Sequence, residues 1–298
     1  MDEQVKIVEV APRDGLQNEN KTLSVAQRVD FIEALAATGL ETIEAGAFVS
    51  PEWVPQMAET AEVLGALNLP DNIALPCLVP NKRGMEDALK AGVQDVAIFT
   101  AASEEFNLKN TNATIEESFE RFAPVMKLAE ANGVKVRGYV STAIACPYSG
   151  RVEPQQVADV AARLFELGCY EISLGDTIGV GRPKDVQTML RSVLLQVPKN
   201  NVALHLHDTF GQALAGIYAG LYEGVRTFDA ACGGLGGCPY AKGASGNVAT
   251  EDVLYLLEGE GFDTGVDLEK MMAVTQNICK VLGTEPRSKV TQALNTAS

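Results

Sequence analysis

Short apolar runs alternate with longer amphipathic segments along most of this chain. Eight runs rich in β-branched residues have the length and pattern of buried strands. They are Val5–Val10, Thr42–Ala45, Ile73–Val79, Asp95–Phe99, Lys135–Val140, Glu171–Leu174, Val202–His207 and Thr227–Ala230. Between them, apolar positions recur with helical spacing. These segments are Ser24–Thr38, Val54–Ala66, Gly84–Ala91, Ile115–Asn132, Gln155–Leu167, Pro183–Gln196, Gln212–Tyr222 and Thr250–Glu258.

Several of the predicted helices end at a glycine that stands just before the next strand. These glycines are Gly39, Gly92, Gly133, Gly168 and Gly224. Glycine adopts the left-handed conformation that ends a helix, so each one indicates a helix end followed by a strand start. About eight such βα units in roughly 260 residues match the length of a (β/α)₈ barrel. The segment from Val266 to about Leu282 predicts a further helix outside the barrel.

A doubly wound open sheet is the alternative architecture. That fold usually has a glycine-rich turn after its first strand, and the segment from Val10 to Gly15, Val-Ala-Pro-Arg-Asp-Gly, is not one. The chain has no Pro/Ser-rich linker, low-complexity tract or block of charge. We therefore predict an α/β fold in which residues 1–298 form one domain, a (β/α)₈ TIM barrel with extra C-terminal helices.

The only two histidines of the chain, His205 and His207, stand two residues apart at the end of a predicted strand. Side chains alternate along a strand, so both imidazoles point to one face while Leu204 and Leu206 point to the other. Two imidazoles at the C-terminal end of a barrel strand are typical of half a site for a divalent metal. The alternative is a pair of interior histidines bonded to their neighbours.

Carboxylates and an arginine stand in or just after other predicted strands. Asp14 could bind a metal or move a proton, and the adjacent Arg13 could hold an oxyanion, unless the pair only forms a turn with a solvated arginine. Asp176 is a carboxylate at a strand exit, or else a turn or cap residue. Glu44 lies inside an apolar run, where a carboxylate must be functional or paired, for instance with Arg13.

Six glycines in fifteen residues mark the segment 233–247 as a loop that can approach a ligand closely. Its thiol, Cys238, is a candidate proton donor, although an incidental cysteine on a flexible loop is the alternative. Asn247 could cap the helix that follows or bind a metal through its amide oxygen. Closing a barrel brings the last strand beside the first, so Asp14, His205, His207 and Asn247 can converge. Such a mixed oxygen and nitrogen set suits Mg²⁺ or Mn²⁺ better than a structural Zn²⁺.

These motifs together resemble the 3-hydroxy-3-methylglutaryl-CoA lyase family over nearly the whole chain. The segments that carry the resemblance are 8–19, 48–57, 168–177, 205–209 and 233–247. The resemblance implies a (β/α)₈ barrel, a divalent metal and retro-Claisen cleavage of the acyl-CoA to acetyl-CoA and acetoacetate, a reaction of leucine degradation and ketone-body formation. It implies that the family's subunits form homodimers.

The resemblance also assigns roles to particular residues. The implied metal ligands are Asp14, His205, His207 and Asn247. The implied catalytic residues are Arg13, Glu44, Asp176 and Cys238. Arg13 and Gln17 are implied to bind the substrate. Gly46 and Ala47 stand where many members have a hydroxyl residue before Phe48, so a longer 3-hydroxy-3-alkylglutaryl-CoA, such as the isohexenyl compound, is an alternative substrate.

Composition limits the remaining function classes. The 24 Lys and Arg against 39 Asp and Glu give a formal net charge of −15, which argues against binding to nucleic acid or to an anionic membrane surface. No apolar stretch is long enough to span a membrane and no signal or transit peptide is recognisable, so we expect a cytoplasmic protein. Two alternatives remain: a Claisen synthase, which usually carries extra C-terminal domains, and a non-catalytic acyl-CoA or metal-binding barrel, which should have lost Arg13 or Cys238.

Overall fold

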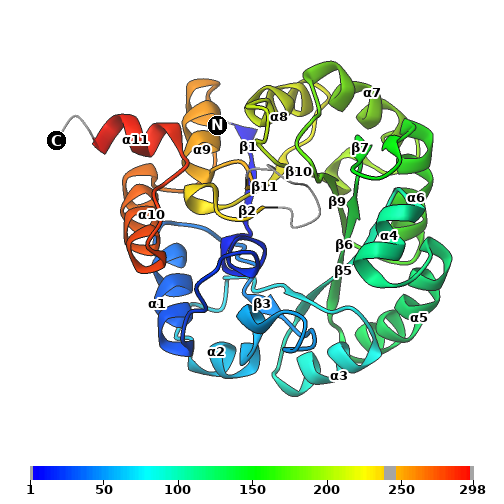
Figure 1. Ribbon diagram of the computed structural model, residues 1–298, viewed down its shortest axis with the longest axis horizontal. Helices are drawn as coiled ribbons and strands as arrows, with labels where there is room; N and C mark the ends of the chain where they lie inside the picture. The colour runs from blue at the N-terminus through cyan, green and yellow to red at the C-terminus, as the bar shows by residue number, and fades with distance from the viewer. Residues whose placement is uncertain (1–2, 238–245, 296–298) are drawn as a thin grey trace.

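Eight parallel strands form a curled sheet at the centre of the molecule (Figure 1). The computed structural model describes residues 3–237 and 246–295. In chain order the strands are β2 (Lys6–Glu9), β3 (Gly46–Ala47), β4 (Cys77–Leu78), β5 (Asp95–Ala101), β6 (Lys135–Ser141), β9 (Glu171–Asp176), β10 (Val202–Leu206) and β11 (Thr227–Ala230). They neighbour one another in chain order from β3 to β11, and β11 pairs with β2. A parallel bridge from Glu9 to Ile43, just before β3, closes the circle.

Helices surround this sheet as an outer ring (Figure 1). They are α1 (Val25–Ala36), α2 (Thr60–Ala66), α3 (Lys82–Lys90), α4 (Glu104–Thr111), α5 (Ile115–Asn132), α6 (Pro154–Glu166), α7 (Pro183–Val193), α8 (Ala213–Tyr222), α9 (Thr250–Gly259), α10 (Leu268–Leu282) and α11 (Lys289–Asn295). The barrel and the additional C-terminal helices α10 and α11 confirm the predicted fold class. Among the described residues no helix is long and apolar enough to cross a membrane.

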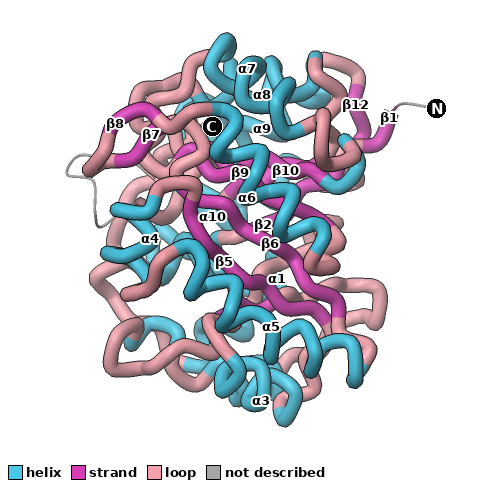
Figure 2. Tube along the Cα trace, turned by 90° about the vertical axis from the view of Figure 1, so that its right-hand side faces the viewer, coloured by secondary structure: helices cyan, strands magenta, loops and turns pink. Residues whose placement is uncertain are grey.

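Two small ribbons lie at opposite ends of the barrel (Figure 2). The antiparallel pair β7 (Ala145–Cys146) and β8 (Gly150–Arg151) follows the carboxyl end of β6. The parallel pair β1 (Glu3–Gln4) and β12 (Phe262–Asp263) lies at the amino end of β2. Because catalytic residues of such barrels lie at the carboxyl ends of the strands, the end with β7 and β8 is the one to search for a site.

The sequence predicted the ends of most helices and strands within a few residues. The five glycines that were expected to end helices all have positive φ angles. Three predictions were wrong in extent. The predicted strand Ile73–Val79 shortens to β4 because Pro76 has no N–H for the ladder. The predicted helix Val54–Ala66 is broken, since Glu59 adopts a left-handed φ of 58° between a 3₁₀ turn and α2. The pairing of Thr42–Ala45 consists of isolated bridges, and the strand β3 begins at Gly46.

The prediction gave no residue range for two of the helices, α4 and α11. In α4 only Phe106 and Asn107 are buried, so this helix carries no apolar stripe that a sequence pattern would reveal. In α11 only Thr291 is buried. Both helices are held by polar contacts instead, for example by the buried Asn107 amide, which donates to Ala113 O and Ser118 Oγ.

Candidate active site

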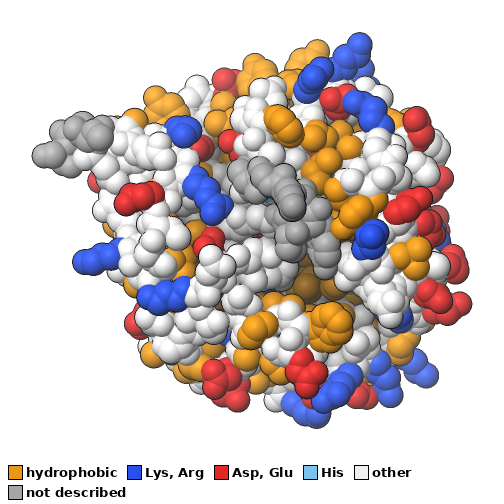
Figure 3. All heavy atoms as spheres, viewed as in Figure 1, with side chains coloured by type: hydrophobic (Ala, Val, Ile, Leu, Met, Phe, Trp, Pro, Cys, Tyr) orange, Lys and Arg blue, Asp and Glu red, His pale blue; other side chains and the backbone are white. Residues whose placement is uncertain are grey.

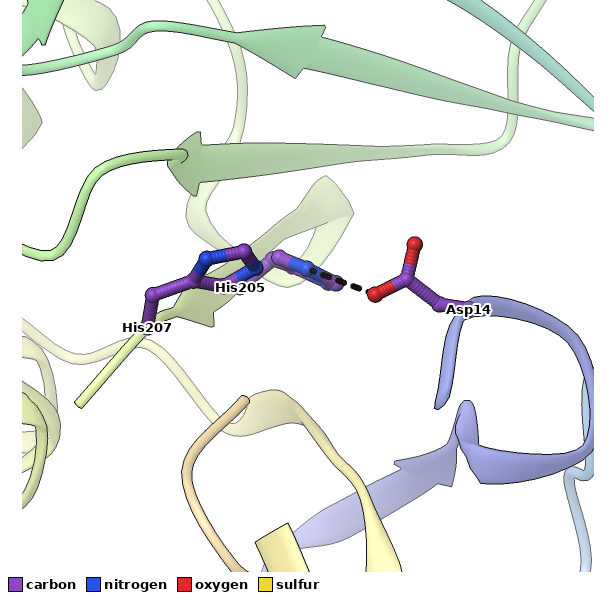
Figure 4. Close-up of side chains that lie close together, drawn as sticks. All are labelled: Asp14, His205 and His207. Carbon is purple, nitrogen blue, oxygen red and sulfur yellow. Dashed lines mark ion pairs between the residues drawn. The ribbon is translucent and has the colours of Figure 1, made fainter. Parts of the chain in front are cut away.

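Three potential metal ligands meet at the carboxyl end of the barrel (Figure 4). Asp14 comes from a single π-helical turn, Ala11–Gly15, that follows β2. His205 lies in β10 and His207 directly follows it. One ligand atom from each of the three side chains lies within 4.8 Å of the others. The Nε2 atom of His205 is 3.9 Å from the Oδ2 atom of Asp14.

The packing of β10 explains why both imidazoles face inward. Leu204 and Leu206 point out of the barrel, where the two glycines Gly216 and Gly220 of α8 make room for them. A Cβ atom at Gly220 would lie only 2.5 Å from Leu204 Cδ1. Alternation along the strand then places His205 inside the barrel. The sequence prediction that the leucines and histidines occupy opposite faces agrees with this geometry.

The protonation states of Asp14 and His207 favour binding of a cation, whereas Asp229 and Asp14 raise the pKa of His205 in spite of its burial. Burial, together with the neighbouring His205, lowers the pKa of His207 to about 4, so this ring is neutral at pH 7. Burial alone would raise the pKa of Asp14, but Arg13 and the histidines lower it to about 2. His207 Nδ1 is buried and has no hydrogen-bond partner within the described part of the chain. A carboxylate and two imidazoles, one of which has an unpartnered ring nitrogen, are a donor set that fits a divalent metal.

Asn247, the fourth predicted ligand, lies beside this cluster. Its Nδ2 atom donates to Asp14 Oδ2 at 2.8 Å and to the carbonyl oxygen of Leu235 at 3.1 Å. The amide thus orients the carboxylate of Asp14. The alternative role as a helix cap was wrong, because α9 begins at Thr250 with Ala249 as its N-cap residue.

Arg13 is buried at the centre of two ion pairs. Its Nη1 atom is 2.6 Å from Asp14 Oδ1, and its Nη2 atom is 2.8 Å from Glu44 Oε2. Glu44 is completely buried, and its burial raises the pKa of its carboxyl group. The centre of the Tyr139 ring lies 5.7 Å from the guanidinium carbon, Cζ, of Arg13. The proposed salt bridge between Glu44 and Arg13 is therefore present, and the alternative of a solvated Arg13 was wrong.

Asp176, the last residue of β9, is also buried. Its Oδ2 atom accepts a hydrogen bond from the Gly181 backbone at 2.7 Å, and its Oδ1 atom accepts one from Val180 at 3.3 Å. Burial raises the pKa of this carboxyl group to about 6 in spite of these hydrogen bonds. The carboxylate stabilises the loop after β9, as the turn interpretation predicted, and its raised pKa also suits a proton acceptor near neutral pH.

Of the two remaining predicted residues, the structure describes Gln17. Gln17 is half-buried, three residues beyond Asp14. Cys238 lies outside the described residues. The flank of its glycine-rich segment is held by Arg287, whose Nη1 atom donates to the carbonyl oxygens of Gly234 and Gly236.

Sequence reasoning missed several charged side chains in the barrel interior. They are Glu9, Arg137, Glu171 and Asp229. Each stands inside a predicted strand, which is the same signal that singled out Glu44. Glu9 accepts hydrogen bonds from the backbone of Ala11 and Cys232 and from Thr250 Oγ1, and so joins the first and last βα units. Asp229 lies 3.1 Å from Nδ1 of His205 and so contacts the candidate metal site directly.

Comparisons with known proteins identify the family of this chain. The HMGL-like family model matches residues 4–278. The hydroxymethylglutaryl-CoA lyase of Pseudomonas mevalonii is 57% identical over 97% of this chain and 96% of its own. The 3-hydroxy-3-isohexenylglutaryl-CoA/hydroxymethylglutaryl-CoA lyase of Pseudomonas aeruginosa is 51% identical over 97% of both chains.

A solved structure from the same group of proteins is also similar to this chain. The crystal structure of hydroxymethylglutaryl-CoA lyase from Pseudomonas aeruginosa superposes with a TM-score of 0.97 at 50% identity, covering 100% of this chain and 99% of that one. The family match spans almost all of the barrel, and the identities extend over nearly the full length of each relative. The chain therefore belongs to the HMGL-like family.

Proposed function

We propose that this protein is a hydroxymethylglutaryl-CoA lyase that cleaves 3-hydroxy-3-methylglutaryl-CoA to acetyl-CoA and acetoacetate. The observation that carries the proposal is the cluster of Asp14, His205 and His207 with Arg13 paired to the same carboxylate. Its support is the 57% identity, over nearly the full length, to a protein of that name.

The proposed cofactor is Mg²⁺ or Mn²⁺, held by Asp14, His205, His207 and the amide oxygen of Asn247. When bound, this metal would hold and acidify the C3 hydroxyl group of the substrate and fix its orientation. For Asn247 to take part, its amide would have to turn from the orientation in which Nδ2 donates to Asp14.

The reaction needs one group to take a proton and others to stabilise and protonate the product. Asp176, or a water molecule that it holds, accepts the proton of the C3 hydroxyl group. Arg13 stabilises the negative charge that develops on the thioester oxygen as the C–C bond breaks. Glu44 holds Arg13 in place, and Gln17 contacts the substrate beside it. Cys238 supplies the proton that converts the enolate into acetyl-CoA.

A longer 3-hydroxy-3-alkylglutaryl-CoA is the second candidate substrate. The 51% identical relative whose name includes both the isohexenyl and the methyl compound favours it. Near the mouth, Gly46 and Ala47 form β3, so the end of this strand carries no hydroxyl side chain.

A comparison of kcat/KM for the methyl and the isohexenyl thioester, measured with the same protein and metal, tests the substrate. The proposal predicts a higher kcat/KM for the methyl compound. A higher value for the isohexenyl compound would assign the protein to the second substrate, and cleavage of neither would contradict both.

The same proposal includes the organisation of the protein. We propose that residues 1–298 form one catalytic domain that assembles as a homodimer and acts in the cytoplasm. The support for one domain is the single apolar core to which the strands and the surrounding helices contribute. Light scattering on the purified protein measures the subunit count, and a mass near the 31.7 kDa of one chain would contradict the dimer.

A further inference from the structure

The second ring nitrogen of His205 contacts a carboxylate on the neighbouring strand. His205 and Asp229 are direct register partners in the parallel pair β10–β11, so both side chains point into the barrel. Nδ1 of His205 lies 3.1 Å from Asp229 Oδ2, while Nε2 faces Asp14. The two ring nitrogens of His205 therefore have different carboxylate neighbours on opposite sides.

Asp229 itself is held rigidly by hydrogen bonds. Arg137 Nη2 donates to its Oδ1 atom at 2.6 Å, and Arg137 Nη1 donates to its Oδ2 atom at 3.0 Å. Ser173 Oγ donates to the same Oδ2 atom at 2.8 Å. All of these side chains are buried. A carboxylate fixed by three donors from two different strands has little freedom to follow the ring of His205, so the ring has to align with it.

The support for Asp229 continues across the barrel interior. Arg137 Nε donates to Glu171 Oε1 at 2.8 Å, and Lys6 Nζ donates to Glu171 Oε2 at 2.7 Å. Charges therefore alternate from Lys6, which is partly exposed at the amino end, through Glu171 and Arg137 to Asp229. Because each buried charge has an opposite neighbour, Asp229 can remain a carboxylate beneath the candidate metal site.

We propose that Asp229 is a positioning residue that keeps the proton of His205 on Nδ1 and turns the lone pair of Nε2 toward the metal. An ionised carboxylate can only accept a hydrogen bond, so a neutral His205 must carry its proton on the nitrogen that faces Asp229. Carboxylates that hold metal-binding histidines in this way increase metal affinity and fix the ring. The inference rests on the proposed metal site but not on the identity of the substrate.

A purely structural role is the competing explanation. In that case Asp229 would serve only to neutralise Arg137, and the tautomer of His205 would not depend on it. Glu171 offers a matched control, because it also neutralises Arg137. Among the described residues its side chain accepts hydrogen bonds from Arg137 and Lys6, and not from His205.

The first test is the imidazole ¹⁵N–¹H spectrum of the metal-free protein, at a pH where both rings are neutral. With only two histidines in the chain, a His207→Gln variant assigns the signals. The proposal predicts a protonated Nδ1 and an unprotonated Nε2 in His205. A proton on Nε2 in the parent protein would overturn it, and this result does not depend on whether any variant at position 229 folds.

The second test compares Asp229→Asn with Glu171→Gln by Mn²⁺ binding, followed through the EPR signal of the free ion. We expect Asp229→Asn to change the tautomer of His205 and to lower Mn²⁺ affinity by about 10- to 100-fold. Glu171→Gln should keep both near the parent values even if it unfolds more easily. Unchanged affinity in Asp229→Asn, or an equal loss in both variants, would overturn the proposal. A parent protein that binds Mn²⁺ but cleaves no thioester would instead contradict only the proposed lyase function.

Discussion

Arg13 is the residue whose surroundings most constrain the chemistry. It is buried between Asp14 and Glu44, so its charge is already paired before any substrate binds. A planar guanidinium has five N–H donors around its edge, so it can hold two carboxylates and still direct an N–H at a developing oxyanion, which an ammonium group cannot do. The proposed role of Arg13 in catalysis therefore depends on the shape of this side chain as well as on its charge.

An Arg13→Lys variant tests this role. We expect kcat to fall by about 10²- to 10³-fold, as for the loss of one oxyanion donor. The lysine keeps the positive charge of residue 13, so this fall would reflect the lost N–H donor. Arg28→Lys is the matched control, because Arg28 is an equally buried arginine that binds Ala58 O and Thr60 Oγ1 away from the site. It should lower the stability of the fold but leave kcat near the parent value. A kcat close to that of the parent in Arg13→Lys would remove Arg13 from the chemistry.

The raised pKa of Asp176 predicts how activity depends on pH. Its pKa is raised to about 6 by burial, so the ionised form that the proposed base requires is lost as the pH falls through 6. The profile of kcat/KM against pH, which reports groups of the free enzyme, should therefore have an acidic limb near pH 6 that is absent from Asp176→Asn, whose kcat/KM should be low at every pH. If the limb persists unchanged in Asp176→Asn, another group is the base.

At the scale of elements, the packing of α8 against β10 explains why the candidate ligands His205 and His207 face into the barrel. Gly216 and Gly220 let α8 approach the outward leucines of β10, and the histidines then face inward. The strand and the helix were both predicted from their patterns, as was the face of His205 and His207. The prediction succeeded because period two and period 3.6 are properties of the local sequence.

A Gly220→Ala substitution tests this contact. The new methyl group would lie 2.5 Å from Leu204 Cδ1 and 3.4 Å from Phe228 Cε1, in a packed interior. We expect the free energy of unfolding to fall by about 1–3 kcal/mol in denaturant titrations. Gly65→Ala in α2 is the control, because a Cβ atom there meets nothing within 4 Å, and it should stabilise by about 0.5–1 kcal/mol. A Gly220→Ala protein as stable as the parent would show that α8 and β10 are not tightly packed.

The parts of the site that were not predicted depend on contacts between distant strands. Arg137 and Asp229 are 92 residues apart, and no local pattern indicates that they pair. Their presence inside apolar strands is a signal for buried charge, but the partner follows only from the closed barrel. The Glu44–Arg13 pair was predictable because two motifs were already assigned to neighbouring strands, whereas the contact of Asp229 with His205 had no second motif to indicate it.

At the scale of the whole molecule, the net charge of −15 opposes an anionic substrate. On the face that Figure 3 shows, Lys and Arg side chains lie around the rim together with Asp and Glu side chains. To bind the proposed CoA thioester, local cations and the proposed metal would have to overcome an unfavourable field at longer range. This is the reverse of electrostatic steering, in which the field of the whole protein attracts its ligand.

Salt should therefore improve substrate binding at low ionic strength. We expect KM for the CoA thioester to fall as salt rises from very low levels, since the screening length shortens to about 10 Å at 0.1 M. The corresponding pantetheine thioester, which lacks the nucleotide phosphates, is the control and should show a weaker dependence. A KM for the CoA thioester that stays flat or rises with salt would contradict this account of the charge.

The central claim is that Asp14, His205 and His207 hold a divalent metal on which cleavage depends. The most direct measurement is the rate of acetyl-CoA release from 3-hydroxy-3-methylglutaryl-CoA by EDTA-treated protein as Mn²⁺ is added back. The account predicts almost no cleavage without metal, saturable recovery on addition of Mn²⁺, and no recovery at the same Mn²⁺ concentrations in a folded His205→Ala variant. Full cleavage by the metal-free protein, or full recovery in His205→Ala, would contradict it.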